Sequence, residues 1–250
     1  MSPRPALTVR PIRFTDDIPG WQTVLGALGA VLLSEHPGWL VYQLGAGRLA
    51  VHAASGAGSG SGSPAGTTVL GFETGMPLAE AVASAAERGV PVELGGTGHG
   101  EAGIVTAADG TSFTLDTPTP NPEDLEATRP ELAVLPIWHA PRPRVALDVL
   151  DGLGMRRRVI EEDGSWVDLT ARSGGLHGVH RREEAGAELS FELEGDVAQL
   201  QEALAEVGVD AQLHEESFGR SLRIADPDGG APVWVVERQP DLYSYALSEL

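Results

Sequence analysis

The chain has 250 residues, of which 42% are hydrophobic, and a formal net charge of −19. This length suffices for one large domain or for two domains of about 120 residues, each with its own core. All 17 Lys or Arg positions are arginine, yet the net charge remains strongly negative, and such a surface repels nucleic acid and anionic membranes. The absence of cysteine excludes disulfides and thiolate metal sites.

The N-terminal segment, MSPRPALTVRPIRF, lacks the apolar core of a signal peptide. No apolar run approaches the roughly 20 residues that a membrane-spanning helix needs. We therefore expect a cytoplasmic protein with neither a membrane nor a nucleic acid as partner. The arginine run at 156–158 is too short to change this expectation, and it predicts an exposed strand edge.

The two halves of the chain repeat one another. Residues 11–29, PIRFTDDIPGWQTVLGALG, match residues 136–154, PIWHAPRPRVALDVLDGLG, 125 positions later. Residues 70–93 match residues 189–212 at a distance of 119 positions, after an extra Gly- and Ser-rich loop at 55–66. Further matched pairs keep the same order: Trp39 and Trp166, His52 and His180, Asp109 and Asp228. So many anchors in one order indicate two copies of one domain.

The repeat defines the domain organisation. We predict a first domain over 1–116, a linker over 117–131, a second domain over 132–238 and a C-terminal tail over 239–250. The linker, TPTPNPEDLEATRPE, is rich in Pro, Thr and acidic residues and cannot bury much surface. The tail is expected to pack on a domain as a short helix or an irregular segment.

Each copy predicts a strand, a helix and several strands, twice. The first helices carry apolar stripes at i, i+3, i+4 and i+7, formed by Trp21, Val24, Leu25 and Leu28, and by Ala146, Val149, Leu150 and Leu153. The second helices end at Gly89 and Gly208, the first of them starting near Pro77. Strands are predicted at 30–34, 39–44, 48–53, 104–106 and 112–116, and the Asp-Gly turns signal hairpins.

This element order resembles the vicinal oxygen chelate superfamily, which includes glyoxalase I, extradiol dioxygenases, and bleomycin- and fosfomycin-resistance proteins. The resemblance covers nearly all of residues 7–238. Its carriers are the helix ends ALG and GLG, the segment FELEGDVAQLQEALAEVGV, and DPDGG before the last strand. It implies an α+β fold of two tandem glyoxalase-like domains, each of two βαβββ modules that form an open half-barrel around a cavity.

Metal-using members of that superfamily hold a divalent cation with His, Glu or Gln from the first and last strands of each module. Counting from the helix-end glycine and the Asp-Gly turns places these positions at Val9, Ala50, Val69 and Thr114, and at Val134, Gly178, Glu188 and Val233. Only Glu188 is a possible ligand. We therefore expect no metal and no other cofactor. The alternative is a divalent metal held in a different way.

Residues two positions from a ligand position share its face of the strand. On this count the second cavity offers Trp138, His180, Glu188 and Glu192, and the first offers Arg13, His52 and Glu73. An aromatic wall with a few polar groups suits a small organic ligand. The alternative is that the two histidines are ordinary strand residues and that the glutamates lie at strand ends beside solvent.

Other aromatic and imidazole side chains have simpler interpretations. Trp39 and Trp166 are expected in the core, and His139 is expected in a solvated turn. Strand alternation places His177 on the face opposite His180.

These observations favour a metal-free glyoxalase-like protein that binds a small hydrophobic or aromatic molecule, a metabolite or an antibiotic. Whether it is an enzyme stays open, because a metal-dependent lyase, isomerase or dioxygenase would need an ion held in another way. A third hypothesis is a non-catalytic interaction protein with vestigial cavities. Since duplication within the chain supplies the pairing that single-domain relatives obtain by dimerising, we expect a monomer.

Overall fold

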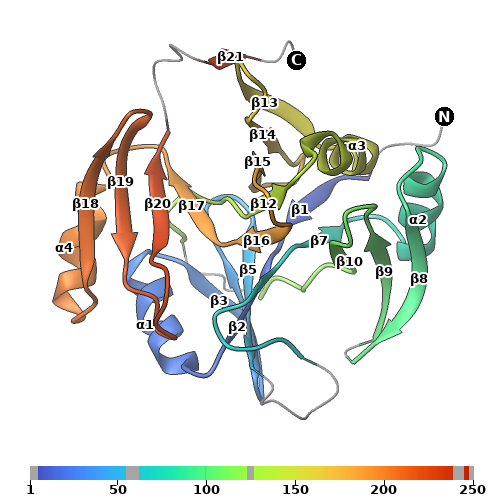
Figure 1. Ribbon diagram of the computed structural model, residues 1–250. Coiled ribbons are helices and arrows are strands. Elements are labelled where there is room, and N and C mark those ends of the chain that lie inside the picture. The colour runs from blue at the N-terminus through green and yellow to red at the C-terminus, as the bar shows by residue number, and fades with distance from the viewer. Residues whose placement is uncertain (1–4, 55–61, 99, 123–126, 239–244, 248–250) are drawn as a thin grey trace.

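The computed structural model describes residues 5–54, 62–98, 100–122, 127–238 and 245–247 (Figure 1). Four βαβββ modules follow one another along this part of the chain. Modules 1 and 2 form the first copy, which consists of β2 (Ile12–Thr15), α1 (Ile18–Ala27), β3 (Val31–His36), β4 (Trp39–Gln43) and β5 (Arg48–Ala53), then β7 (Gly71–Thr74), α2 (Leu78–Ala86), β8 (Val92–Thr97), β9 (Gly100–Thr106) and β10 (Ser112–Asp116).

Modules 3 and 4 form the second copy with the same order of elements. They consist of β12 (Ile137–Ala140), α3 (Pro143–Leu153), β13 (Arg156–Glu161), β14 (Trp166–Thr170) and β15 (Leu176–Arg181), then β17 (Ser190–Leu193), α4 (Ala198–Glu206), β18 (Ala211–Glu216), β19 (Gly219–Ile224) and β20 (Val233–Glu237). The helix-end glycines of the repeat, Gly29 and Gly154, both have a positive φ, 79° and 97°. Glycine is favoured there because it enters the left-handed region without a Cβ penalty.

Short strands tie the two modules of each copy together. They are β1 (Leu7–Val9), β6 (Thr68–Val69), β11 (Leu132–Val134) and β16 (Gly186–Glu188). β1 joins the sheet of module 2 in the order β1-β7-β10-β9-β8, while β6 joins the sheet of module 1 in the order β3-β4-β5-β2-β6. β11 and β16 do the same in the second copy. Pro11 and Pro136 stand where the chain passes between sheets, and proline has no N–H to continue a ladder.

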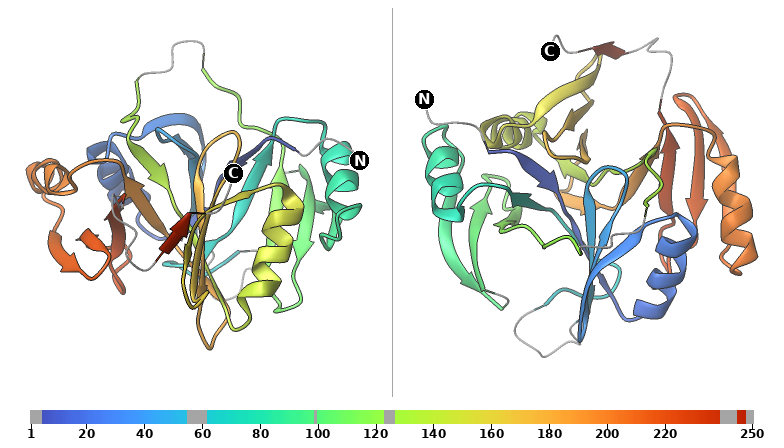
Figure 2. Two further views of the ribbon diagram at one scale, coloured as in Figure 1. Left: turned by 90° about the horizontal axis from the view of Figure 1, so that it is seen from above. Right: turned by 180° about the vertical axis from the view of Figure 1, so that it is seen from behind.

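The four modules are arranged in a ring (Figures 1 and 2). The two sheets of each copy face one another, and in the second copy a cavity lies between them. Between the copies, α1 of module 1 packs on α4 of module 4. On the other side of the ring, Arg88 at the end of α2 donates a hydrogen bond of 2.5 Å to the Gly152 carbonyl in α3. One hydrophobic core runs through all four modules.

The two Asp-Gly turns of the repeat connect one copy to the other. Asp109, before β10, accepts a hydrogen bond of 3.1 Å from the Trp138 indole in β12. Asp228, before β20, accepts one of 3.2 Å from the Trp21 indole in α1. Burial alone would raise the pKa of Asp228, but hydrogen bonds from Thr15, Asp16 and Trp21 hold it below its ordinary value. Matched residues of the repeat therefore hold the two copies together.

The tail and the linker differ from what the sequence predicted. The tail forms a strand, β21 (Tyr245–Leu247), which pairs with the β13 edge, in place of a helix. Part of the linker is more closely packed than expected, because Thr119 and Asn121 bond to side chains of the first copy. Most of the loop at 55–66 lies outside the described residues. None of the helices in the described ranges is long and apolar enough to span a membrane.

His177 lies at the contact between the two copies. Its ring stacks on Phe72 of module 2, with centroids 5.7 Å apart, and meets Trp138 edge to face at 6.5 Å. Its Nδ1–H donates to the Gly178 carbonyl at 3.0 Å. Complete burial lowers the pKa of His177 to about 4, so this imidazole is neutral near pH 7. The expected placement of His177 opposite His180 is confirmed.

Acid should destabilise the fold through His177. Between its ordinary pKa of 6.5 and its folded value of about 4, the unfolded chain binds a proton that the folded chain excludes. Stability therefore falls as the pH drops through this window. The variant His177→Leu introduces the residue found at the matched position of the first copy, Leu49. Between about pH 7 and pH 5, its free energy of unfolding should fall by about 2 kcal/mol less than that of the wild type.

Urea denaturation at the two pH values measures this difference. His36→Gln, which removes an exposed imidazole, serves as the control and should keep the wild-type pH dependence. Equal losses for His177→Leu and the wild type would show that His177 is not the sensitive group.

Candidate functional site

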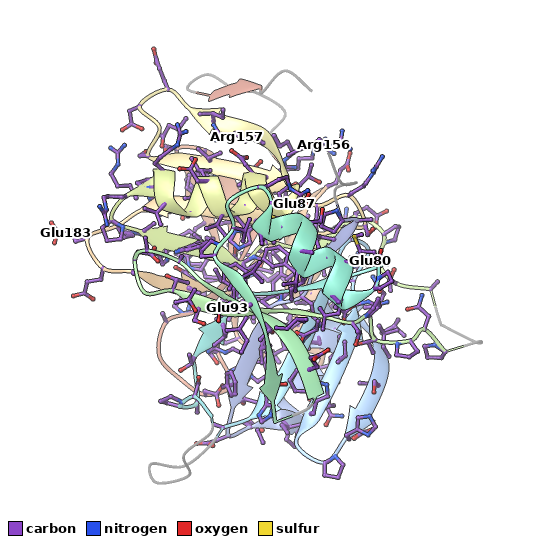
Figure 3. The ribbon with its side chains drawn as sticks, turned by 90° about the vertical axis from the view of Figure 1, so that its right-hand side faces the viewer. Glu80, Glu87, Glu93, Arg156, Arg157 and Glu183 are labelled. Atoms are coloured by element: carbon purple, nitrogen blue, oxygen red, sulfur yellow. The ribbon has the colours of Figure 1, made fainter. Side chains whose placement is uncertain are left out.

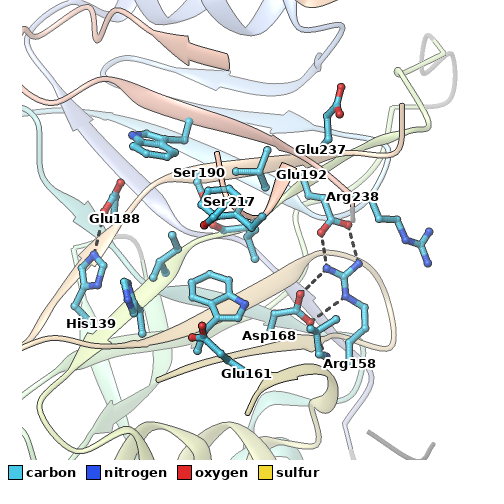
Figure 4. A pocket seen from close by; sticks show the side chains of 18 of the residues that line it. His139, Arg158, Glu161, Asp168, Glu188, Ser190, Glu192, Ser217, Glu237 and Arg238 are labelled. Carbon is cyan, nitrogen blue, oxygen red and sulfur yellow. Dashed lines mark hydrogen bonds and ion pairs between the residues drawn. The ribbon is translucent and has the colours of Figure 1, made fainter. Parts of the chain in front are cut away.

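The two sheets of the second copy enclose a cavity of about 560 Å³ (Figure 4). Strands of both modules 3 and 4 contribute to its wall. The lining residues are Leu135, Ile137, His139, Arg158, Val159, Glu161, Trp166, Asp168, His180, Arg182, Glu188, Ser190, Glu192, Ser217, Phe218, Trp234, Val236, Glu237 and Arg238. This volume is in the usual range of small-molecule sites.

Arg158 and two carboxylates form one side of this cavity (Figure 4). The guanidinium donates to Asp168 at 2.6 and 3.0 Å and to Glu192 at 2.7 and 2.5 Å. Burial alone would lower the pKa of Arg158, but the bonds to Glu192 and Asp168 raise it, so the side chain stays charged. Bidentate pairing fixes the orientation of the guanidinium as well as its charge. We call these three residues the Arg158 triad.

A β-bulge directs Arg158 into the cavity. The pairing of β13 with β14 shifts register between Arg157 and Val159, which leaves Arg158 at the irregularity. Bulges of this kind re-aim a side chain that regular alternation would place elsewhere. Arg156 and Arg157 lie on the outer surface in Figure 3, where Arg157 pairs with Asp151 at 2.5 Å. The prediction of an exposed strand edge therefore fits Arg156, fits the half-buried Arg157 only in part, and is wrong for Arg158.

Two histidines and a glutamate form the opposite side. His139 Nε2–H donates to Glu188 at 3.0 Å, and the His139 and His180 rings are 5.7 Å apart. Burial, and then the charges of Arg182 and His139, lower the pKa of His180, which favours its neutral form near pH 7. His139 lies in strand β12 with a largely buried side chain, so the prediction of a solvated turn was wrong.

Aromatic side chains complete the wall. The Trp166 indole contacts His180 edge to face, with centroids 5.8 Å apart. It occupies the space above Gly178, where an added Cβ would lie 2.5 Å from the indole Cη2. Trp234, on β20, carries the Arg223 guanidinium 4.3 Å from its ring centroid. Trp166 was expected in the core, but it lines the cavity.

The same positions of the first copy are apolar. Strand pairing aligns Phe14 with His139, Val41 with Asp168 and Val69 with Glu188. A matching register shift in β3 aligns Leu33 with Arg158. These residues pack together in a small cluster of Ile12, Phe14, Leu33, Trp39, Val41, Ala50 and Val69. Because the first copy folds with apolar residues there, the ionisable set of the second copy is not a requirement of the fold.

Charged residues of the first copy form ion pairs with one another. Glu73 pairs with Arg10 at 3.0 Å and with Arg48 at 2.5 Å, and it accepts a bond of 2.8 Å from Thr119 of the linker. Arg10 also pairs with Asp116. Glu73 is only 2% exposed, so its carboxylate is occupied by this network and is not open to a ligand.

Three of the seven predicted site residues line the cavity, namely His180, Glu188 and Glu192. Glu192 does so as part of the Arg158 triad. His52 lies on the inner face of the first copy, where its ring meets Phe14 and Trp39 at 5.1 and 5.4 Å. Whether any of these side chains binds a ligand stays a prediction.

The predicted orientations of Trp138 and Arg13 were wrong. Trp138 is fully buried on the far side of β12, against Phe113 of the first copy. Arg13, its counterpart, pairs with Asp226 at the contact of modules 1 and 4, and burial lowers its pKa. Counting from a helix end gives the distance along the chain but does not show which face of the strand a residue occupies.

The same error affects some of the positions assigned to metal ligands. In the second copy, Leu135 directly after β11 and Trp234 on β20 line the cavity, whereas the neighbouring Val134 and Val233 do not. Val9 is likewise fully buried in β1. Sequence reasoning missed His139, Arg158 and Asp168. A comparison of the two copies for ionisable residues opposite apolar ones would have found them.

The residues present do not fit the metal that the superfamily implies. His139, His180 and Glu188 are neighbours, but His139 donates directly to Glu188, so these two groups occupy one another. Within the described ranges, no group of three or more His, Asp or Glu side chains is placed to hold a metal ion.

No family model matches the sequence. No curated protein is found as a relative either. Several solved structures match over nearly the whole chain. A variant of homoprotocatechuate 2,3-dioxygenase from B. fuscum has a TM-score of 0.62 at 14% identity, covering 96% of this chain and 73% of its own. The 2,3-dioxygenase LapB from Pseudomonas sp. KL28 has a TM-score of 0.60 at 14% identity, covering 94% and 92%.

A third match is a mutant of 4-hydroxymandelate synthase from Streptomyces coelicolor, with a TM-score of 0.54 at 15% identity and coverage of 95% and 93%. The chain therefore has the vicinal oxygen chelate fold. More narrowly, it has the form with two tandem domains of two βαβββ modules each, as the repeat predicted. At these identities the likeness shows the fold and not the activity.

Replacing Arg158 alone should destabilise the protein more than replacing Arg158 together with Asp168 and Glu192. Arg158→Leu leaves Asp168 and Glu192 largely buried without their cation, which should lower the free energy of unfolding by about 3–5 kcal/mol. The triple variant Arg158→Leu, Asp168→Val, Glu192→Gln removes the stranded charges and should recover most of that loss.

Urea denaturation measures these differences. Arg157→Leu is the control, because it breaks a partly exposed pair with Asp151 and should cost less than about 1 kcal/mol. A loss for Arg158→Leu no larger than that of the control would contradict the importance of the triad.

Proposed function

We propose that this protein binds a small aromatic molecule in the cavity of its second copy. The observation that carries this proposal is the difference between the copies. One fold, repeated in one chain, carries a packed apolar cluster on the inner face of the first copy and a cavity of about 560 Å³ in the second. Around this cavity, His139, Arg158, Asp168 and Glu188 stand where the first copy has apolar residues. Selection for fold stability alone gives no reason for this difference.

The wall suits a planar ligand. Trp166, Trp234 and Phe218 supply aromatic surface, while Ser190 and His180 supply polar groups. Such a mixture of apolar surface and few polar groups is typical of small-molecule sites. The first copy is then a structural partner that supports the second through the Asp109 and Asp228 contacts. We expect the chain to act as a monomer, since each copy already pairs with the other.

A second candidate function is an enzyme that transfers protons. It is favoured by the His139–Glu188 pair, in which a carboxylate orients an imidazole at the edge of the cavity. A metal-dependent reaction would need a rearrangement that separates these two side chains. Elemental analysis of protein purified without a histidine tag tests that metal-dependent reaction, since stoichiometric metal would favour it.

A screen of planar aromatic compounds by thermal shift and calorimetry tests the binding proposal. We expect at least one compound to bind in a 1:1 complex, since the proposed site is the single cavity of the second copy described above. Binding should be lost in a variant that fills this cavity, such as Ser190→Phe, provided that its circular dichroism is native. The absence of any binder, or binding that Ser190→Phe leaves intact, would overturn the proposal.

Gly178→Ala should weaken binding without unfolding the protein. Its Cβ would lie 2.5 Å from the Trp166 indole, so the indole must move into the cavity. We expect an affinity loss of about tenfold and a cost in stability of about 1–3 kcal/mol. Ala50→Gly, the reverse exchange at the matched position of the first copy, is the control and should leave affinity unchanged. Calorimetry and tryptophan fluorescence of both variants check this prediction.

A further inference from the structure

The lining of the second-copy cavity carries a net negative charge. Five of its side chains are carboxylates and three are guanidinium groups, which makes a formal charge of −2 with the histidines left out of the count. A wall of this sign attracts organic cations and disfavours ligands with a carboxylate or a phosphate. The charge of the wall therefore bears on the class of ligand.

Two of the carboxylates have no arginine partner among the described residues. Asp168 and Glu192 share Arg158, and Glu237 pairs with Arg220 at 2.8 Å. Glu161 instead accepts a hydrogen bond from Ser165, and Glu188 accepts one from His139. Because neither is tied to a guanidinium group, Glu161 and Glu188 are the carboxylates that a bound cation can reach.

These two carboxylates flank an aromatic surface. Ile160 pairs with Val167, so the next residues of this hairpin, Glu161 and Trp166, stand opposite one another. The Trp166 indole in turn contacts His180. The charges of both Glu161 and Glu188 act to raise the pKa of His180, against the larger effect of burial.

The charge of Arg182 also acts on His180, but Arg182 is exposed to solvent, which screens its charge. An indole beside carboxylates is a favourable place for an organic cation.

The first copy keeps the tryptophan and lacks both carboxylates. Trp39 occupies the position of Trp166 and pairs with His36, which therefore stands where the second copy has Glu161. Val69 occupies the position of Glu188. Since the tryptophan is common to both copies, the acidic pair is a specific feature of the open cavity.

Building on the proposed function, we propose that the cavity binds a planar aromatic amine in its protonated form. The ring packs against Trp166, and the ammonium group lies between Glu161 and Glu188. The Arg158 triad forms the other side of the site and keeps its guanidinium occupied, so that it offers no free cation to an anionic ligand.

Three probes with one ring system test this inference on the full chain, namely naphthylmethylamine, naphthylmethanol and naphthoate. Calorimetry should show that the amine binds about tenfold more tightly than the alcohol and that the acid binds most weakly. Raising the salt concentration from about 0.02 M to about 0.5 M should reduce the preference for the amine, because salt screens partly exposed charges.

The variant Glu161→Gln with Glu188→Gln should lose most of that preference and keep its affinity for the alcohol. Glu35→Gln with Glu101→Gln removes two exposed carboxylates of the first copy and should behave like the wild type. Binding of alcohol and amine with equal affinity, or a preference that survives loss of Glu161 and Glu188, would overturn this inference and leave the proposed function standing. Failure of all three probes to bind would count against both.

Discussion

Every inward-facing side chain of this fold must either pack against its neighbours or face an open hollow. Each sheet has a helix on one side, and its other side curves around the centre of a copy. The first copy satisfies this constraint with apolar packing and with an ion network around Glu73. The second copy keeps its hollow open, with Arg158 held between Asp168 and Glu192. The proposed site exists because the second copy meets the constraint in this way.

The duplication makes this division of roles possible. A single domain of this kind would have to be both stable and hollow. Here the packed first copy supports the second across the Asp109–Trp138 and Asp228–Trp21 contacts and through the buried His177. Stability and the proposed binding can therefore be placed in different halves, which is a physical reason for two copies of one fold to diverge in their inner faces.

Much of the architecture was predictable. The matched segments gave the two copies, and the apolar stripes gave the helices, because both signals are local and repeat at a fixed spacing. The site was predictable only in part. His180, Glu188 and Glu192 were placed on the cavity wall, but Trp138 and Arg13 were assigned to the wrong face of their strands. A shift of one residue exchanges the two faces of a strand. The chain changes sheet at Pro136, between β11 and β12, and the sequence does not show this change, so the face of each residue could not be counted across it.

The sequence by itself determined the duplication, the order of elements, the strongly negative charge and the mainly apolar character of the expected ligand positions, because each of these is carried by the identity and spacing of residues along the chain. Only the tertiary structure decided that the second copy holds a cavity and which side chains face it. Arg158 lies in an arginine run that predicts an exposed edge, and a bulge in β13 directs it inward. Its partners come from β14 and from the sheet of another module, and no local pattern encodes a contact between sheets.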